Sequence, residues 1–152
     1  MHGAVTQEAA VLLATPLQNV RFHAAVEDAE LGLLTTGGIR GEMACLNQLQ
    51  EVDKAWFVAP GACEEGIERR GNVVLLAHRS GFHHPDLVAA SDFLVGKAGY
   101  GTIAEARASG VSFAYVLREN FRESVCLREY LCREDMGFEI SEEEFHSASW
   151  LD

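Results

Sequence analysis

Residues 92–110 read Asp92-Phe-Leu-Val-Gly-Lys-Ala-Gly-Tyr-Gly-Thr-Ile-Ala-Glu-Ala-Arg-Ala-Ser-Gly110, an apolar run that passes through a glycine-rich turn into a helical pattern. The branched and aromatic residues 93–95 favour a buried strand. Gly96, Gly99 and Gly101 predict a break in that strand, where the backbone turns sharply or comes close to a ligand. We expect a helix to follow, with Thr102 as its cap and Gly110 at its end.

The start of this helix predicts a binding site for a phosphate. First-turn amides have no partner within a helix, and the helix dipole favours negative charge there. Residues 99–104 also fit the G-x-G-x-x-G/A pattern of dinucleotide sites, with Glu119 at about the separation expected of a ribose-binding carboxylate. That pattern normally follows the first strand of a sheet, and here it follows the fourth predicted strand. The alternative is that these glycines only let a helix and a strand pack closely.

Length and charge limit the classes of function. A chain of 152 residues, 48% of them hydrophobic, can bury one core, so we expect a single domain. The net charge of −11 argues against nucleic-acid binding, which needs clustered Lys and Arg. No apolar run is long enough to span a membrane, and no signal peptide is recognised at the N-terminus. We therefore expect a cytoplasmic protein.

Cysteine and histidine spacing gives no indication of a metal site. The four cysteines form no C-x-x-C pair, which is typical of reduced, packing thiols. His78, His83 and His84 cluster near Arg79, but no carboxylate or cysteine spacing supports them as metal ligands. Contacts with a base or a phosphate, or plain solvation of a loop, are the better interpretations. No metal is expected.

Short apolar segments alternate with helical patterns along most of the chain. This alternation predicts a doubly wound α/β domain, with a parallel sheet of about five or six strands and helices on both faces. The domain is assigned to residues 29–152, and residues 1–28 receive no function. The predicted strands are 31–34, 55–58 (ended by Pro60 and Gly61), 72–77, 93–95 and 112–117, and the predicted helices are 42–52, 86–91, 102–109, 120–132 and one near the C-terminus.

Ligands of such folds bind beyond the carboxyl ends of the strands. The turn at residues 35–41 and the glycine turn at 96–102 both fall at that edge, so we expect them to face one crevice. Arg118, Arg122 and Glu123 surround the end of the fifth predicted strand and can bind a polar ligand. The alternative for this segment is a solvated helix start with Asn120 as the N-cap.

Three blocks of sequence together resemble a known family. They are residues 84–92, 95–105 and 115–123, and their joint spacing resembles the C-terminal, donor-binding domain of GT-B glycosyltransferases, in the group that includes the peptidoglycan N-acetylglucosaminyltransferase. The resemblance covers roughly residues 72–140 and extends more weakly to residues 36–41. It implies a Rossmann-like domain that forms one half of a GT-B fold.

The resemblance also implies a ligand and the residues that bind it. The ligand is a nucleotide sugar, a UDP-sugar by preference, and no metal is implied. Family members carry a polar residue, often Gln, at the position of Glu123, so the identity of the sugar stays open. The implied diphosphate and ribose contacts are Gly37, Gly38, Gly99, Tyr100, Gly101, Thr102 and Glu105; those with the base are His83 and His84; and those with the sugar are Arg118, Phe121 and Glu123.

The family needs a second, N-terminal domain for the acceptor, and we expect this chain to lack it. Alone, the chain is then expected to bind the donor and to transfer nothing. Two alternatives stay open at this point: a non-catalytic or regulatory nucleotide-binding module, and an NAD-type dinucleotide-binding domain. A third, an interaction module whose glycines are only structural, predicts no affinity for nucleotides.

Overall fold

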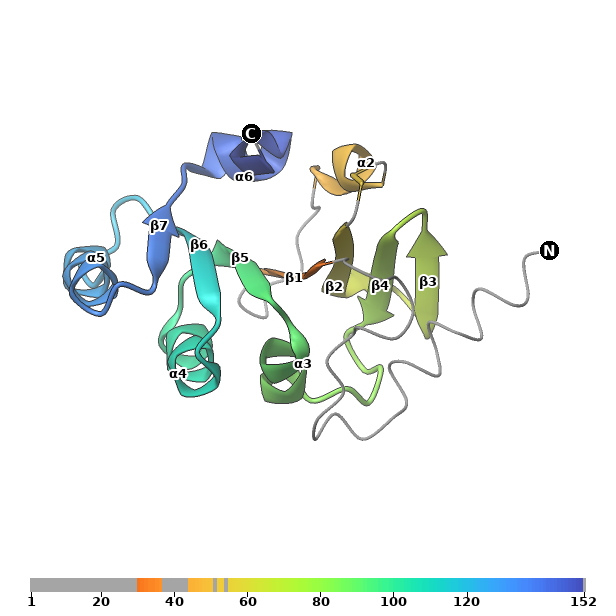
Figure 1. Cartoon of the computed structure of the whole chain (residues 1–152), viewed down its shortest axis with the longest axis horizontal. Helices are drawn as coiled ribbons and strands as arrows, with labels where there is room; N and C mark the ends of the chain where they lie inside the picture. Colours follow the sequence, from red (N-terminus) through yellow and green to blue (C-terminus); the bar gives the residue numbers. More distant parts are fainter. Residues whose placement is uncertain (1–29, 37–43, 51, 54, 152) are drawn as a thin grey trace.

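A computed structural model describes residues 30–36, 44–50, 52–53 and 55–151 of the 152-residue chain. Seven strands form one sheet in the order β3-β4-β2-β1-β5-β6-β7, and all neighbouring pairs are parallel except β3 with β4 (Figure 1). The predicted doubly wound α/β class is confirmed. The segment 1–28 and the glycines Gly37 and Gly38 lie outside the described residues. The strands are β1 (Glu30–Thr35), β2 (Ala55–Cys63), β3 (Ile67–Arg70), β4 (Val73–Ala77), β5 (Phe93–Lys97), β6 (Ser112–Val116) and β7 (Gly137–Glu139).

The first parallel strand, β1, lies at the centre of the sheet between β2 and β5. Leu33 is opposite Val58 on one side and Leu94 on the other. Asp92 fixes this register at the start of β5, because its amide donates to the Leu31 carbonyl at 2.8 Å and its carboxylate accepts from the Leu31 amide at 2.7 Å. The later strands lie on both sides of β1, with β2, β4 and β3 on one side and β5, β6 and β7 on the other.

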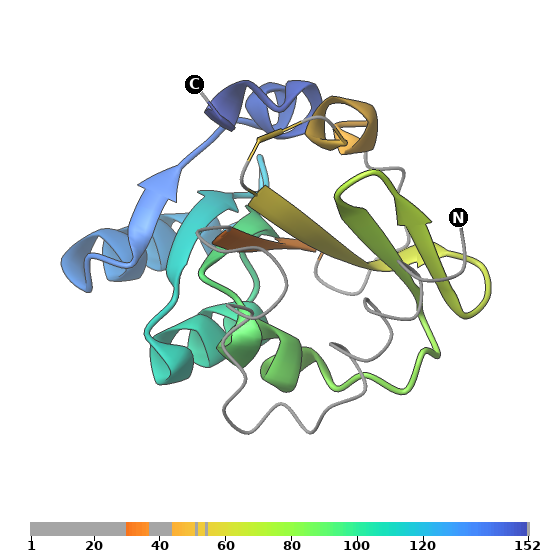
Figure 2. The ribbon, with the colours of Figure 1, turned by 45° about the vertical axis from the view of Figure 1, so that its right-hand side comes forward.

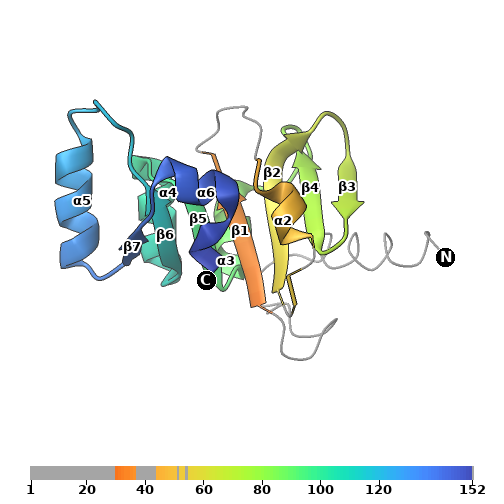
Figure 3. The same cartoon turned by 90° about the horizontal axis from the view of Figure 1, so that it is seen from above.

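Helices cover both faces of the sheet, as predicted (Figures 1 and 2). Two helices, α3 and α4, lie on one face, and α2 and α6 lie on the other. The helix α5 lies beyond β6 and β7 at one end of the sheet (Figure 3). The helices are α2 (Leu46–Leu49), α3 (His84–Ala90), α4 (Tyr100–Ser109), α5 (Ser124–Arg133) and α6 (Glu142–Ser147), and a 3-10 turn (Ser149–Leu151) follows.

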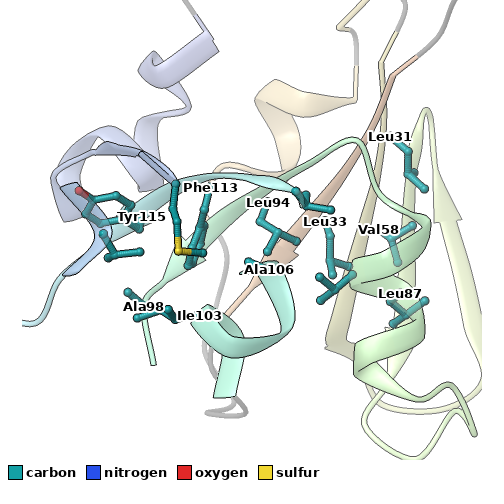
Figure 4. Close-up of a cluster of buried hydrophobic side chains, with 14 of the residues drawn as sticks. Leu31, Leu33, Val58, Leu87, Leu94, Ala98, Ile103, Ala106, Phe113 and Tyr115 are labelled. Atoms are coloured by element: carbon teal, nitrogen blue, oxygen red, sulfur yellow. The ribbon is translucent and has the colours of Figure 1, made fainter. Parts of the chain in front are cut away.

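Two hydrophobic clusters hold these layers together, one on each face of the sheet. Leu33 and Leu94 of the central strands pack with Ile103 of α4 and Leu87 of α3 (Figure 4). On the other face, Phe57 packs with Phe145 of α6. Because strands covered on both faces bury every side chain, β4 and β5 are apolar runs without alternation.

Two short strands were missed in the sequence analysis because their residues are mostly exposed. The antiparallel edge strand β3 reads Ile-Glu-Arg-Arg, and charged residues are a common way to protect a sheet edge. All three residues of β7 are exposed. Short polar strands of this kind carry no apolar run for a pattern search to find.

The predicted boundaries of three elements, β2, β5 and α2, were wrong. The strand β2 continues past Pro60 and Gly61, because a register shift between Pro60 and Cys63 absorbs them as a bulge. Gly96 lies inside β5 and does not break it. Within the described residues of 42–52, helix is confined to Leu46–Leu49.

The helix α5 begins four residues later than predicted. Asn120 adopts a left-handed φ of 61° and is not its N-cap; Glu123 takes that position. Leu127 and Leu131 are buried. Val125 is 57% exposed because it lies two residues, or about 200° of helical rotation, from Leu127.

Candidate functional site

A cavity of about 390 Å³ opens where the direction of winding reverses, next to the carboxyl ends of β1 and β5. In doubly wound sheets this position is the usual crevice for a ligand. The ends of β1 and β4 and the residues after them contribute to its wall, together with a segment of β2 and the starts of α3 and α4. The lining residues are Thr35, Thr36, Pro60, Gly61, Ala77, His78, Ser80, Phe82, His84, Leu87, Gly99, Gly101, Thr102 and Glu105.

The helix α4 directs its N-terminus toward this cavity. Gly99 is the N-cap, with extended backbone, and no side chain caps the helix. Thr102 is therefore not the cap as predicted; it lies buried in the first turn. Within the described part of the chain, the amides of residues 100–102 make no hydrogen bond, whereas the Ala98 amide donates to the Val116 carbonyl at 3.0 Å. Of the anion site predicted from residues 96–102, only the first turn of α4 thus has amides free of partners in the described part of the chain.

Gly99 and Gly101 leave space on the cavity side of this turn. A Cβ atom built on either glycine meets no atom within 4 Å. Neither glycine has a positive φ, so conformational freedom does not account for them. Because these two residues have no side chain, the space through which a ligand reaches the amides at the start of α4 stays open.

Glu105 lies one and a half turns into α4 and binds the imidazole of His84. Its Oε2 is 2.5 Å from Nδ1 of His84, at the start of α3. Nε2 of the same ring lies 3.5 Å from Oγ1 of Thr35, at the end of β1. The structure thus brings together two predicted residues, Glu105 and His84, and places beside them Thr35, the first residue of the turn 35–41 that we expected at this crevice.

Other predicted residues lie outside the cavity wall. His83 is exposed and its Nδ1 is 3.6 Å from Asp86 Oδ2. Arg118 stacks over the ring of Phe121, 5.8 Å from its centroid, and Phe121 is 41% exposed. The roles assigned to these residues stay predictions.

Tyr100 and Glu123 lie together on the same sheet edge, also away from the cavity wall. Tyr100 is 61% exposed. Loss of hydration and the neighbouring Glu123 carboxylate raise the pKa of its phenol. The segment after β6 therefore meets the start of α4 at this edge.

Pro60 and Phe82 line the cavity although no site role was predicted for either of them. A signal for them was available, because each comes shortly after a predicted strand, 55–58 for Pro60 and 72–77 for Phe82. The rule that identified the turn at residues 96–102 would have selected them if it had been applied to every predicted strand.

Within the described ranges, no three His, Cys, Asp or Glu side chains gather in a way that could hold a metal ion. No helix in those ranges is long and apolar enough to cross a membrane.

Comparison with known proteins supports the fold. No protein-family model matches the sequence. An L-arabinokinase from Arabidopsis thaliana is 34% identical over 95 residues, which are 62% of this chain but only 9% of that protein.

Three solved structures resemble the chain over most of its length. The glycosyltransferase SnogD from Streptomyces nogalater has a TM-score of 0.57 at 18% identity and covers 88% of this chain. The kitacinnamycin glycotransferase has a TM-score of 0.58 at 17% identity over 81% of this chain, and the spinosyn forosaminyltransferase SpnP has a TM-score of 0.50 at 11% identity over 85%. The chain spans only 39%, 34% and 35% of those three chains. At these identities the likeness shows the fold, which is the Rossmann-like fold of a GT-B domain.

Proposed function

We propose that residues 29–152 form the nucleotide-sugar-binding domain of a GT-B glycosyltransferase and act together with an acceptor-binding domain. The observation that carries the proposal is the cavity beside β1 and β5, which the first turn of α4 and Glu105 line together. The chain covers 34–39% of each glycosyltransferase structure, so the likeness is to one part of such an enzyme.

The diphosphate of the ligand binds the amides of residues 100–102. These amides have no protein partner in the described part of the chain, and the dipole of a ten-residue helix favours an anion at its N-terminus. When a glycosidic bond breaks, negative charge grows on the leaving diphosphate. Amides already oriented toward that charge need no reorganisation, and donors of this kind contribute about 3 kcal/mol each.

Glu105 accepts hydrogen bonds from the ribose hydroxyls. Its Oε2 binds His84, and Oε1 has no hydrogen-bond partner among the described residues, so its lone pairs can accept from a ligand. A charged acceptor of this kind is worth about 1.5–3 kcal/mol when its partner is a hydroxyl removed from water. The ligand in this proposal is a UDP-sugar, which is the donor implied by the resemblance to the peptidoglycan N-acetylglucosaminyltransferase group.

The sugar extends from the cavity over Tyr100 toward the segment that follows β6. Phe121 offers an exposed ring there, and Arg118 and Glu123 offer charged groups for sugar hydroxyls. The glycines Gly37 and Gly38 are assigned to the phosphates on the resemblance alone.

A ligand panel on the purified chain tests the proposal. UDP, UDP-glucose, UDP-N-acetylglucosamine, ADP-glucose, NAD and NADP are compared by calorimetry and thermal unfolding. Ligand at about 100 times its dissociation constant stabilises the fold by roughly 2.7 kcal/mol, which is readily measured. We expect the UDP compounds to bind and Glu105→Gln to weaken binding about tenfold or more.

Glu129→Gln is the matched control for this panel, because Glu129 is an exposed carboxylate on α5 far from the cavity wall. It should bind like the wild type. Binding of NAD without binding of UDP would replace the proposal with a dinucleotide-binding domain. UDP binding that Glu105→Gln leaves unchanged would remove the ribose assignment.

A second candidate function follows from the similarity to the L-arabinokinase. That similarity has the higher sequence identity, although it covers a small part of the kinase. It favours a non-catalytic nucleotide- or sugar-binding module of a larger protein. ATP, ADP and L-arabinose added to the same panel distinguish this module, since a UDP-sugar site should not respond to them.

A further inference from the structure

One imidazole connects two walls of the cavity. His84 is the first residue of α3, and its ring lies between Glu105 of α4, with Nδ1 2.5 Å from Oε2, and Thr35 of β1, with Nε2 3.5 Å from Oγ1. The side chains of His84 and Glu105 are 34% and 25% exposed, and both line the cavity. The ring is therefore positioned by the protein and still within reach of a ligand.

Glu105 determines which nitrogen of His84 is left to accept a proton. A carboxylate only accepts hydrogen bonds, so the N–H of Nδ1 donates to Oε2 of Glu105. Nε2, on the side of Thr35, is then the nitrogen that can take up a further proton. Carboxylates orient histidines in this way in many binding sites.

Among the described residues that line the cavity, little positive charge is available to offset an anion. Its described lining residues include no Lys or Arg, and the only lining groups that can become cationic are His78 and His84. Lys97 of β5 is engaged 3.3 Å from Glu142 of α6, and His83 faces Asp86. With neutral histidines, a bound diphosphate would therefore share this small space with the negative charge of Glu105.

We propose that His84 gains a proton when a nucleotide diphosphate binds, and that its imidazolium contributes positive charge that helps the cavity hold a diphosphate beside Glu105. This inference rests on the proposed function and adds to it a binding role for His84 that differs from the base contact expected from the sequence. Glu105 acts as the positioning residue for the imidazole.

If His84 takes up a proton when the ligand binds, the affinity for the ligand depends on pH. The protonated ring is favoured more in the complex, where it faces a diphosphate, than in the free protein. Linkage then requires affinity to rise as pH falls, by up to about tenfold per pH unit for one proton taken up. The titratable groups other than His84 that line the described part of the site are Glu105 and His78, and a variant can remove His78.

UDP-glucose is the suitable probe, because its diphosphate diester has no group that titrates between about pH 6 and about pH 8, unlike free UDP, whose terminal phosphate does. Calorimetry at both pH values, in buffers of different ionisation enthalpy, measures the affinity and the protons taken up. We expect binding about tenfold weaker at about pH 8 than at about pH 6, with uptake approaching one proton.

The variants separate charge from structure. His84→Asn keeps an N–H donor near the position of Nδ1 but cannot become cationic, so it should bind UDP-glucose weakly and equally at both pH values. His84→Gln is a second variant in case the first is unstable, and circular dichroism checks that both are folded. His146→Asn is the matched control, since His146 lies 3.7 Å from Glu142 on α6, on the other face of the sheet. It should keep the pH dependence of the wild type.

Each outcome decides a different question. UDP-glucose binding that is equally tight at both pH values, or a pH dependence that survives in His84→Asn, overturns the role of His84 and leaves the proposed function standing. A pH dependence lost in His78→Asn but kept in His84→Asn assigns the proton to the other histidine and also overturns it. Absence of nucleotide binding at either pH overturns the proposed function together with this inference.

Discussion

Gly96 of β5 faces Thr35 of β1 so closely that a Cβ atom at position 96 would lie 1.8 Å from the Thr35 carbonyl oxygen. Gly96 also has a φ of 147°, which L side chains rarely adopt. This contact joins the two strands that border the cavity. The glycine is thus needed for close approach of two strands, and not for a turn or a ligand as its sequence context suggested.

We expect Gly96→Ala to lower the free energy of unfolding by about 3 kcal/mol or more, because the backbone of β1 or β5 must move to relieve the clash. Urea unfolding followed by circular dichroism measures the change. Gly99→Ala is the control, because a Cβ atom at position 99 meets nothing within 4 Å. It should lower the free energy of unfolding by less than about 1 kcal/mol, since Ala is a poorer N-cap residue than Gly. Equal stability of the two variants would contradict the close approach.

The substitution Gly101→Ala should separate stability from ligand binding. Gly101 lies in the first turn of α4 with open space around it, so Ala should stabilise the helix by up to about 1 kcal/mol. The same methyl group narrows the approach to the helix amides, and affinity for UDP-glucose should fall. Ser109→Ala, an exposed position at the other end of α4, is the control and should leave affinity unchanged. Unchanged affinity in Gly101→Ala would show that the ligand does not approach this turn.

The four cysteines should differ widely in reactivity toward a thiol reagent. Cys45 is fully buried, and burial raises its pKa from 9.0 to about 11, so its thiolate fraction near neutral pH falls about a hundredfold. Cys126 and Cys132 are exposed. Spectroscopic thiol titration should find the two exposed thiols reacting first and Cys45 reacting only on unfolding. Rapid labelling of Cys45 in the folded protein, identified by mass spectrometry, would contradict this burial.

An ion pair between α5 and β7 should give a small, pH-dependent stabilisation. Arg128 donates two hydrogen bonds to Glu139, at 2.6 and 2.8 Å, and lowers the pKa of that carboxyl. A lowered folded-state pKa contributes stability that is present above the unfolded value of about 4.3 and is lost as pH falls through the folded value.

Arg128→Gln should therefore reduce the free energy of unfolding by less than about 1 kcal/mol near pH 7, because both side chains are partly exposed, and the difference from wild type should shrink below about pH 4. Urea unfolding across this pH range measures it. Arg122→Gln removes an exposed arginine that has no ion pair among the described residues, and it should show no such trend. A difference that grows on acidification would contradict the assignment.

Sequence reasoning failed where a strand pairing distant in sequence, or a local hydrogen bond, overrode the preference of the residue type. Pro60 and Gly61 normally end a strand, yet β2 continues because β4 pairs with it on both sides of a bulge. Asn120 is a favourable cap by residue type, but the chain adopts a left-handed turn there and the Ser124 hydroxyl donates to the Arg118 carbonyl at 2.8 Å. The strands β3 and β7 exist only because β4 and β6 offer them an edge.

The amino-acid sequence by itself determined the strand, the glycine turn and the helix of residues 92–110, and from their alternation with other apolar runs the doubly wound class. These features depend on side-chain periodicity and glycine placement within a few residues. Only the tertiary structure decided that Glu105 binds His84 and that Thr35 lies at the other ring nitrogen, because strand order alone brings the end of β1 beside β5 and its following helix. No local pattern contains that order, since residues 21 and 49 positions apart meet only after the sheet has formed.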